Sequence, residues 1–299
     1  MGRFAKKDPN VVAQKQAANV MKQLQGSVLK SVATVANYEK RLTEIAKHVN
    51  KEFNLPLREI TPDVAIQYLE QRSEQVGQKT LDMERQALQA MMQNVTKQLP
   101  QGETLTVIKS EKDQALRSRA YTPEQVKLIA QAQRTNNSLS TELAHAAGLR
   151  AHELLTLSRL DEQKASARPE LDSKFKGREG VIYTVHGKGG LVRKVSIPVP
   201  LAERLERTRL DTPQRITDRG VHYTTKYQIT GGQKWSNSFS AASKRALGWS
   251  EGAHGVRHSY AQQRMDELQR MGYGREVALE TVSQEMGHFR PDITEVYLR

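Results

Sequence analysis

The C-terminal end of this chain carries residues that could act on a phosphate ester. Tyr297 is the third residue from the end of the sequence, and His254, Arg257 and His288 precede it. A tyrosine hydroxyl has a pKa of about 10, so it is a poor nucleophile at neutral pH unless basic groups surround it. Because the neighbouring groups are basic, an anion is the target that suits this tyrosine best. The pattern indicates a nucleophile delivered to a phosphate.

A second candidate residue, Arg150, follows a glycine at an expected break between helices. One helix should stop at Gly148, and a new one should run over 150–157. A cation is mildly disfavoured at a helix N-terminus, so Arg150 would make sense there if it bound an anion together with free backbone N–H groups. An ordinary pair between Arg150 and Glu153 explains the same residues equally well. Helix–Gly–helix is also the outline of a helix-turn-helix, although 150–157 is short and apolar for a recognition helix.

The third candidate is Lys188, within Gly187-Lys188-Gly189-Gly190. These residues should form the tip of a β-hairpin whose strands are 181–185 and 192–199. Glycines let the backbone approach a bulky partner and place the lysine on a mobile arm. A plain turn with a solvated lysine is the alternative. A P-loop is excluded, because neither the earlier glycine nor the Ser or Thr after the lysine is present.

The segment from His254 to His258 offers two kinds of chemistry. His254 and Arg257 are three residues apart, so on a helix they share a face that could grip a phosphate. His254 and His258 have the spacing of two zinc ligands. A zinc hydrolase would have Glu next to the first histidine, where this chain has Gly255, so no metal site is predicted.

Composition narrows the classes of partner. The 299 residues include 46 Lys and Arg against 33 Asp and Glu, a formal charge of +13 with a pI near 9.8. This excess favours a polyanionic partner, nucleic acid first and an acidic membrane surface second. No apolar run approaches the roughly 18 residues of a membrane span, and there is no secretory signal. The absence of cysteine excludes a disulfide framework, a thiol nucleophile and cysteine-ligated zinc.

The elements that carry these residues are expected to form two domains. Residues 1–102 should be an all-α helical bundle. Its clearest helix covers 34–53, where apolar residues recur at spacings of three and four: Tyr38, Leu42, Ile45, Val49 and Phe53. Other helices are expected over 11–25, from Pro62 behind the N-cap Thr61, and from Thr80.

The charged, aperiodic stretch 103–120 suits a linker, so the second domain should cover 121–299. This domain is expected to be mainly α with a small β-sheet, an α+β fold. Thr122 and Gln125 can close a capping box at the start of its first helix. Its helices are predicted at 123–133, 139–147, 150–157, 201–207, 238–247, 254–271 and 275–286.

Taken together and in this order, the candidates resemble the tyrosine recombinases, the phage integrase family. The resemblance covers 121–299 and fills all six positions at which that family has catalytic residues: Arg150, Lys188, His254, Arg257, His288 and Tyr297. The surrounding motifs also match: Gly148-Leu149-Arg150 before Glu153-Leu154-Leu155, His254-Gly255-Val256-Arg257-His258-Ser259-Tyr260-Ala261, and Met286-Gly287-His288. Residues 1–102 would then be the family's SAM-like core-binding domain, which binds DNA.

The resemblance implies a role for each residue. Arg150 and Arg257 would clamp the scissile phosphate, and the two histidines would hydrogen-bond to it. Tyr297 would attack, with His254 as the acceptor of its proton, and form a 3′-phosphotyrosyl bond. Lys188 would protonate the departing 5′ oxygen. Neither a cofactor nor a metal would be needed.

The same resemblance implies partners and a biological setting. The substrate would be double-stranded DNA with a specific recombination site, held in a tetrameric synaptic complex, for integration or excision of a mobile element. Accessory DNA-bending or directionality proteins are further candidates, and no membrane is involved. The expected location is the cytoplasm of a bacterium, at the nucleoid, for a bacterial or phage-encoded protein.

One departure and two alternatives stay open. Family members usually continue after the tyrosine, whereas only Leu298 and Arg299 follow Tyr297 here, which leaves communication between subunits open. A type IB topoisomerase uses nearly the same residues to relax supercoils. A non-catalytic helix-turn-helix regulator would explain the positive charge but not Lys188, His288 or Tyr297.

Overall fold

The computed structural model describes residues 8–114 and 116–299. The chain divides into two compact units, an N-terminal unit of residues 1–115 and a C-terminal unit of residues 116–299. Within the described residues, no helix is both long and apolar enough to span a bilayer.

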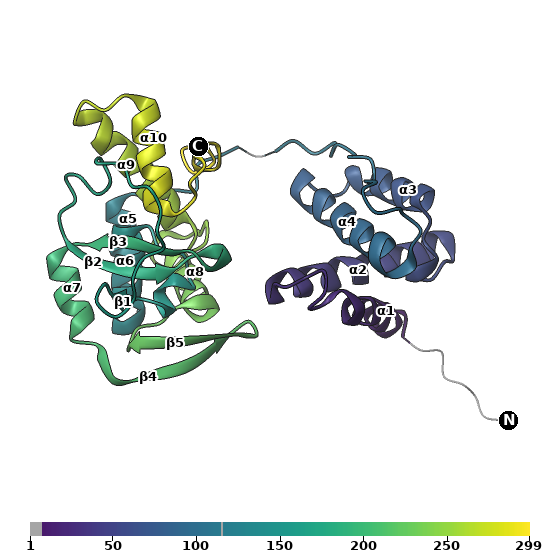
Figure 1. Cartoon of the computed structure of the whole chain (residues 1–299), viewed down its shortest axis with the longest axis horizontal. Helices are drawn as coiled ribbons and strands as arrows, with labels where there is room; N and C mark the ends of the chain where they lie inside the picture. The colour runs from purple at the N-terminus through teal and green to yellow at the C-terminus, as the bar shows by residue number, and fades with distance from the viewer. Residues whose placement is uncertain (1–7, 115) are drawn as a thin grey trace. The chain divides into compact units, whose positions relative to one another are not determined.

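All the regular elements described within residues 8–114 are helices, as predicted for an all-α domain (Figure 1). Its helices are α1 (Pro9–Leu24), α2 (Val32–Phe53), α3 (Pro62–Ser73) and α4 (Gln78–Met91), with a short 3-10 turn at Leu57–Glu59 and a π-helical turn at Met92–Thr96. Leu42, Ile45 and Val49 of the predicted stripe are fully buried in the core of the unit. Thr61 caps α3 as expected, because its side chain accepts a hydrogen bond from the N–H of Val64.

The first part of the charged stretch after α4 is tied to the N-terminal unit. Leu105 is buried in its core. The backbone N–H of Ser110 donates to the Gln78 side chain (2.8 Å), and that of Glu111 donates to the carbonyl of Ser73 (3.1 Å). These bonds satisfy backbone groups that have no partner in a regular element.

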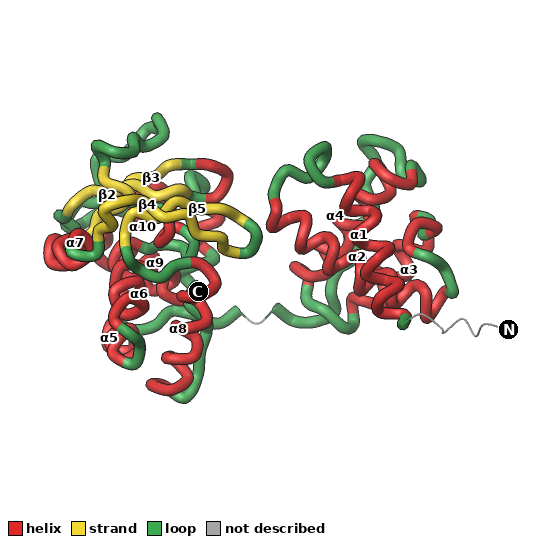
Figure 2. The backbone as a smooth tube through the Cα atoms, turned by 90° about the horizontal axis from the view of Figure 1, so that it is seen from below, coloured by secondary structure: helices red, strands yellow, loops and turns green. Residues whose placement is uncertain are grey.

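The C-terminal unit combines helices with two small antiparallel sheets, so the α+β prediction is confirmed. Its helices are α5 (Pro123–Gln131), α6 (Thr135–Ala147), α7 (Val199–Glu206), α8 (Gly232–Leu247), α9 (Gly255–Arg270), α10 (Arg275–Met286) and α11 (Pro291–Glu295), with 3-10 turns at Glu153–Leu155 and Lys188–Gly190. Its strands are β1 (Ser158–Arg159), β2 (Val181–His186), β3 (Val192–Ile197), β4 (Arg209–Asp218) and β5 (Val221–Tyr227). Figure 2 shows the strands gathered on one side of this unit and α5, α6 and α8 on the other.

The predicted hairpin is present. Strands pair in the order β1-β2-β3, with Val181 opposite Ile197 and His186 opposite Val192. Its tip carries Lys188, as the glycines indicated. The capping box of Thr122 and Gln125 at α5 is also present.

Several features differ from the sequence predictions, and the first lies after α6. The helix predicted over 150–157 is wrong: only the short turn Glu153–Leu155 forms there. The N–H of Arg150 donates to the Glu153 side chain and the carbonyl of Ala151 accepts from Gly232, so tertiary bonds replace the helical ladder. A helix-turn-helix would need a second helix over these residues, and none forms there.

Two further differences lie between α7 and α8. The hairpin β4–β5 was not predicted, because most of β4 is exposed and lacks an alternation of apolar and polar residues. Helix α8 starts at Gly232 and not at 238. Its first turn is capped by a distant residue, since Asp218 accepts a hydrogen bond from the N–H of Gln233 (2.8 Å).

Candidate active site

Tyr297 lies among the basic side chains that the sequence singled out. Its hydroxyl is 3.1 Å from Nε2 of His254. The centre of its ring is 4.7 Å from that of His258 and 5.0 Å from that of His288, and the guanidinium carbon of Arg257 lies 5.6 Å from the ring centre. The Tyr297 hydroxyl thus lies beside an imidazole nitrogen of His254, and the Arg257 guanidinium lies over the face of the Tyr297 ring.

The segment that carries Tyr297 is held by the unit to which it belongs. The N–H of Tyr297 donates to the carbonyl of Thr294 (2.9 Å), and the amide of Gln262 on α9 donates to the carbonyl of Tyr297 (3.1 Å). Tyr297 also packs against the apolar core between α9 and α10. The tyrosine therefore reaches the site from its own chain.

Arg257, in the first turn of α9, is fully buried. Its Nη1 donates to the carbonyl of Gly148, and its Nη2 lies 3.2 Å from both the carbonyl of Met286 and Nε2 of His288. Burial and the nearby Arg150 lower the pKa of Arg257 to about 10, so the group is charged at neutral pH. A buried charge held on carbonyl groups is well placed for an anion.

Gly148 can supply that carbonyl because of its backbone conformation. It ends α6 with φ of +57°, and a Cβ at this position would lie 2.8 Å from the ring of Tyr260. Only glycine meets both conditions without strain.

Arg150 is paired with Glu153, the alternative that the sequence left open. Its Nη1 donates to Oε1 of Glu153 (2.7 Å) and approaches the carbonyl of Met286 (3.5 Å). Because the same carbonyl accepts from Arg257, the two guanidinium groups are neighbours. The pairing therefore places Arg150 in the site and does not remove it to the surface.

Glu153 is shared by three arginines. It is fully buried, and it accepts hydrogen bonds from Arg150 and from Arg193, while Nη1 of Arg257 lies 3.9 Å away. Burial alone would raise the pKa of Glu153, but Arg193 and Arg257 hold it well below its usual range. Three guanidinium groups thus surround one carboxylate, which leaves an excess of two positive charges.

The histidines beside this cluster are neutral. Burial, Arg257 and Arg150 lower the pKa of His288 to about 3. Since Arg257 donates to Nε2 of His288, the proton of that ring belongs on Nδ1, which lies 3.1 Å from the hydroxyl of Thr294. Loss of hydration and Arg257 likewise lower the pKa of His254 to about 3, so it can accept a proton.

Lys188 lies on the hairpin tip, outside the set of hydrogen-bonded candidates. It is exposed at the hairpin tip, and its ammonium makes no hydrogen bond or ion pair with residues 8–114 or 116–299. The neighbouring Gly187 nevertheless borders the site: a Cβ there would lie 3.6 Å from Oε1 of Glu153 and 4.0 Å from Nη1 of Arg150. The hairpin therefore places the lysine at the edge of the arginine cluster.

The structure thus brings together five of the six candidates and sets the sixth beside them. Sequence reasoning missed Arg193 and Gln262, and considered His258 only as a zinc ligand. Arg193 left a signal, since it has the two-residue spacing that places it on the same face of β3 as the buried Val195 and Ile197. Among the described residues, no three His, Cys, Asp or Glu side chains converge as a metal site would require.

Known structures with this fold are similar over nearly the whole chain. XerH site-specific recombinase, bound to palindromic difH substrate in a post-cleavage complex, has 15% identity and a TM-score of 0.59 over 98% of this chain and 93% of that one. A lambda integrase dimer bound to a COC′ core site has 18% identity and a TM-score of 0.59 over 95% of this chain and 94% of that one. A lambda integrase tetramer bound to a Holliday junction has 17% identity and a TM-score of 0.59 over 95% of this chain and 76% of that one.

A third similar protein is the Tn1549 transposon integrase in complex with transposon right end DNA, with 13% identity and a TM-score of 0.54 over 96% of this chain and 95% of that one. No family model matches the sequence, and no curated protein matches it either. At these identities the likeness establishes a shared fold, and the chain therefore has the fold of the tyrosine recombinases.

Proposed function

We propose that this chain is a site-specific DNA recombinase that cleaves and rejoins DNA through a 3′-phosphotyrosyl intermediate. The charge of the site carries the proposal: three guanidinium groups surround one carboxylate, beside a phenol 3.1 Å from a neutral imidazole. An excess of two positive charges matches a phosphodiester whose charge grows from −1 to −2 as a phenolate adds to phosphorus.

Tyr297 is the proposed nucleophile and His254 the acceptor of its proton. The hydroxyl already lies within hydrogen-bond distance of Nε2 of His254. The cations nearby make this histidine a weak base in the free protein. A bound phosphate offsets those cations and raises the pKa of His254, so the base gains strength only when substrate is present.

Arg150 and Arg257 are the proposed clamp on the non-bridging oxygens. Arg257 donates to the carbonyl of Met286 (3.2 Å) and Arg150 approaches it (3.5 Å), so the two planar groups lie next to each other. Planar guanidinium groups suit a phosphate better than ammonium groups do. Nε2 of His288 accepts from Arg257 in the free protein. Once Arg257 turns to the phosphate, a proton on this Nε2 would let His288 donate to the same oxygens.

Lys188 is the proposed general acid. As the bond between phosphorus and the tyrosine oxygen forms, the bond to the 5′ oxygen breaks, and that oxygen takes a proton from Lys188. The phosphodiester energy stays in the covalent link. A 5′ hydroxyl from a second duplex can then attack phosphorus, release Tyr297 and join the new strands.

The proposed substrate and assembly follow from strand exchange. Two duplexes require four protomers, and lambda integrase forms a tetramer on a Holliday junction. We assign residues 1–102 to a core-binding domain on the DNA, 103–120 to the linker and 121–299 to catalysis. The reaction would integrate or excise a mobile element at the nucleoid, in the cytoplasm, with accessory DNA-bending or directionality proteins as further partners.

Capture of the covalent intermediate tests the proposal. A nicked or suicide substrate carrying element-end DNA should give a protease-sensitive, slowly migrating adduct. Tyr297→Phe keeps the ring but removes the nucleophile, so DNA binding should persist while the adduct disappears. Tyr273→Phe is the matched control, because Tyr273 packs against the same α9–α10 core.

Two outcomes would contradict the proposal. An adduct formed by Tyr297→Phe would mean that another residue is the nucleophile. A protein that relaxes supercoiled plasmid at one protomer per duplex, without strand exchange, would be a type IB topoisomerase.

A further inference from the structure

Arg193 is a buried arginine on β3 that none of the proposed catalytic steps uses. Its side chain is 2% exposed and faces inward with Val195 and Ile197. A guanidinium group in such a position is costly unless all its hydrogen bonds are made inside the protein.

Each nitrogen of Arg193 is bonded to the site. Nη2 donates to Oε2 of Glu153 (2.7 Å) and to the carbonyl of Gly148 (3.2 Å), and Nε donates to Oε1 of Glu153 (3.4 Å). Nη1 donates to the carbonyl of Glu285 (2.6 Å). One side chain therefore joins the turn after α6, the carboxylate at Glu153 and the end of α10.

The acceptors of Arg193 are the groups that hold the proposed phosphate clamp. The carbonyl of Gly148 also accepts from Arg257, and the carboxylate of Glu153 also accepts from Arg150. Glu285 is followed by Met286, whose carbonyl binds both clamp arginines. Moving any of these acceptors would move the clamp.

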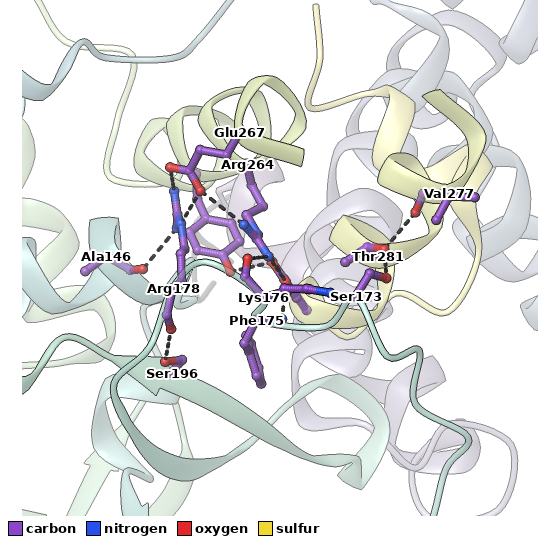
Figure 3. Close-up of polar contacts among 12 residues, drawn as sticks. Ala146, Ser173, Phe175, Lys176, Arg178, Ser196, Arg264, Glu267, Val277 and Thr281 are labelled. Carbon is purple, nitrogen blue, oxygen red and sulfur yellow. Dashed lines mark hydrogen bonds and ion pairs between the residues drawn. The ribbon is translucent and has the colours of Figure 1, made fainter. Parts of the chain in front are cut away.

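The end of α10 is a rigid anchor for Arg193. The buried carboxylate of Glu285 accepts from the hydroxyl of Tyr260 (2.8 Å), from Nε of Arg264 (3.0 Å) and from the N–H of Phe175 (2.8 Å). One turn earlier, the hydroxyl of Thr281 lies 2.6 Å from that of Ser173 (Figure 3).

The loop at 173–178 that receives these bonds is itself fixed to α9. Arg178 binds both oxygens of Glu267 (2.6 and 2.7 Å), and Arg264 donates to the same carboxylate (3.2 Å) and to the carbonyl of Lys176 (2.9 Å) (Figure 3). The carbonyl of Glu285 is therefore an acceptor with little freedom to move.

Gly287 shows how closely Arg193 fits. A Cβ at this position would lie 2.7 Å from Cδ of Arg193, and the backbone here has φ of +70°. The turn to His288 is thus shaped around the stem of Arg193, which connects the Lys188 hairpin to the His288 turn.

We propose that Arg193 is a positioning residue for DNA cleavage, which orients Arg150 and Arg257 through Glu153, Gly148 and the end of α10. It does not touch the phosphate, because its nitrogens are engaged inside the unit. The inference rests on the proposed function, since it concerns the same site.

Single-turnover cleavage by Arg193→Met, at saturating enzyme on a suicide substrate, tests the inference. The rate should fall about 10- to 100-fold, as for loss of charge-assisted hydrogen bonds to a site, while the Kd for DNA changes less than about threefold. Arg193→Lys should recover part of the rate, because it retains the charge but not the fork. Arg204→Met, which removes an arginine paired with Glu142 (2.9 Å) between α6 and α7, is the matched control and should cleave normally.

A double-mutant cycle with Glu153→Gln keeps the test decisive if Arg193→Met folds poorly. The pair Arg193→Met with Glu153→Gln removes both charges, so no uncompensated carboxylate is left in the interior. Because Arg193 and Glu153 hold the same clamp, the double variant should lose less cleavage rate than the two single losses combined. Additive losses would overturn the inference, as would normal cleavage per folded molecule of Arg193→Met. All rates are compared with wild type, so a wild-type protein that forms no adduct would instead contradict the proposed function.

Discussion

Substituting Arg257 by lysine keeps one positive charge at the centre of the site but removes the planar fork. In the free protein Nη1 binds the carbonyl of Gly148, and Nη2 is shared between the carbonyl of Met286 and His288. Nε is buried without a partner among residues 8–114 and 116–299. A phosphate can therefore receive two bonds from Arg257, one from Nε and one from Nη2 in place of His288.

Lysine can replace one of these two bonds. Loss of the other, a charge-assisted hydrogen bond of about 1.5–3 kcal/mol, corresponds to about a 10- to 150-fold slower cleavage step. The cost in stability should be smaller. The carbonyl of Gly148 still accepts from Arg193, and that of Met286 is still approached by Arg150.

Single-turnover cleavage of a suicide substrate measures the first effect, and a thermal melt measures the second. Arg270→Lys is the control, because Arg270 lies exposed at the other end of α9. Cleavage by Arg257→Lys within threefold of wild type would refute the assignment of Arg257 to the phosphate. If the cleavage rate fell only as much as the affinity for DNA, Arg257 would contribute to DNA binding and not to stabilising the transition state.

Three further results are expected. Lys188→Ala should slow cleavage of ordinary DNA about 100-fold or more. It should cleave a 5′-bridging phosphorothiolate at the normal rate, because that leaving group needs no proton. Arg150→Ala should be slow on both substrates, and equal rescue of the two variants would contradict the role of Lys188. Burial and neighbouring arginines lower the pKa of His288 to about 3 and that of His258 to about 4, below the value of about 6.5 in an unfolded chain. The unfolded state therefore binds more protons, so the DNA-free protein should lose stability as the pH falls from about 6.5 toward 4, and melting curves that do not shift over this range would contradict it. Residues 116–299 alone should bind DNA more weakly than the whole chain and with a shallower salt dependence, because phosphate contacts are lost with the helical domain. Equal slopes for fragment and whole chain would mean that the N-terminal unit serves another partner.

Local patterns determined much of the fold. The stripe of Leu42, Ile45 and Val49 identified α2, because residues three and four apart share a helix face. The capping box of Thr122 and Gln125 marked the start of α5. Glycines between two runs of β-branched residues located the hairpin that carries Lys188. These signals depend on neighbours in sequence, which is why they could be read without the structure.

The sequence also determined which residue types are available for chemistry, and their order. It did not determine how they meet. Arg150 precedes a short 3-10 turn and does not begin a helix, because Glu153 turns inward to accept from its N–H. The outcome at 150–157 depends on Arg193, which is distant in the chain and supplies the charge that lets Glu153 stay buried.

Only the tertiary structure decided the charge balance of the site. The carbonyls of Gly148 and Met286 become acceptors for arginines because α6 and α10 end at the same place, in contact with β3 and α9. A guanidinium group can be buried at many positions of a sequence, but its energy depends on acceptors that arrive from distant segments. Periodicity and capping patterns carry no information about contacts between distant segments. The grouping of three arginines on one carboxylate, next to Tyr297, therefore becomes visible only once the chain is folded.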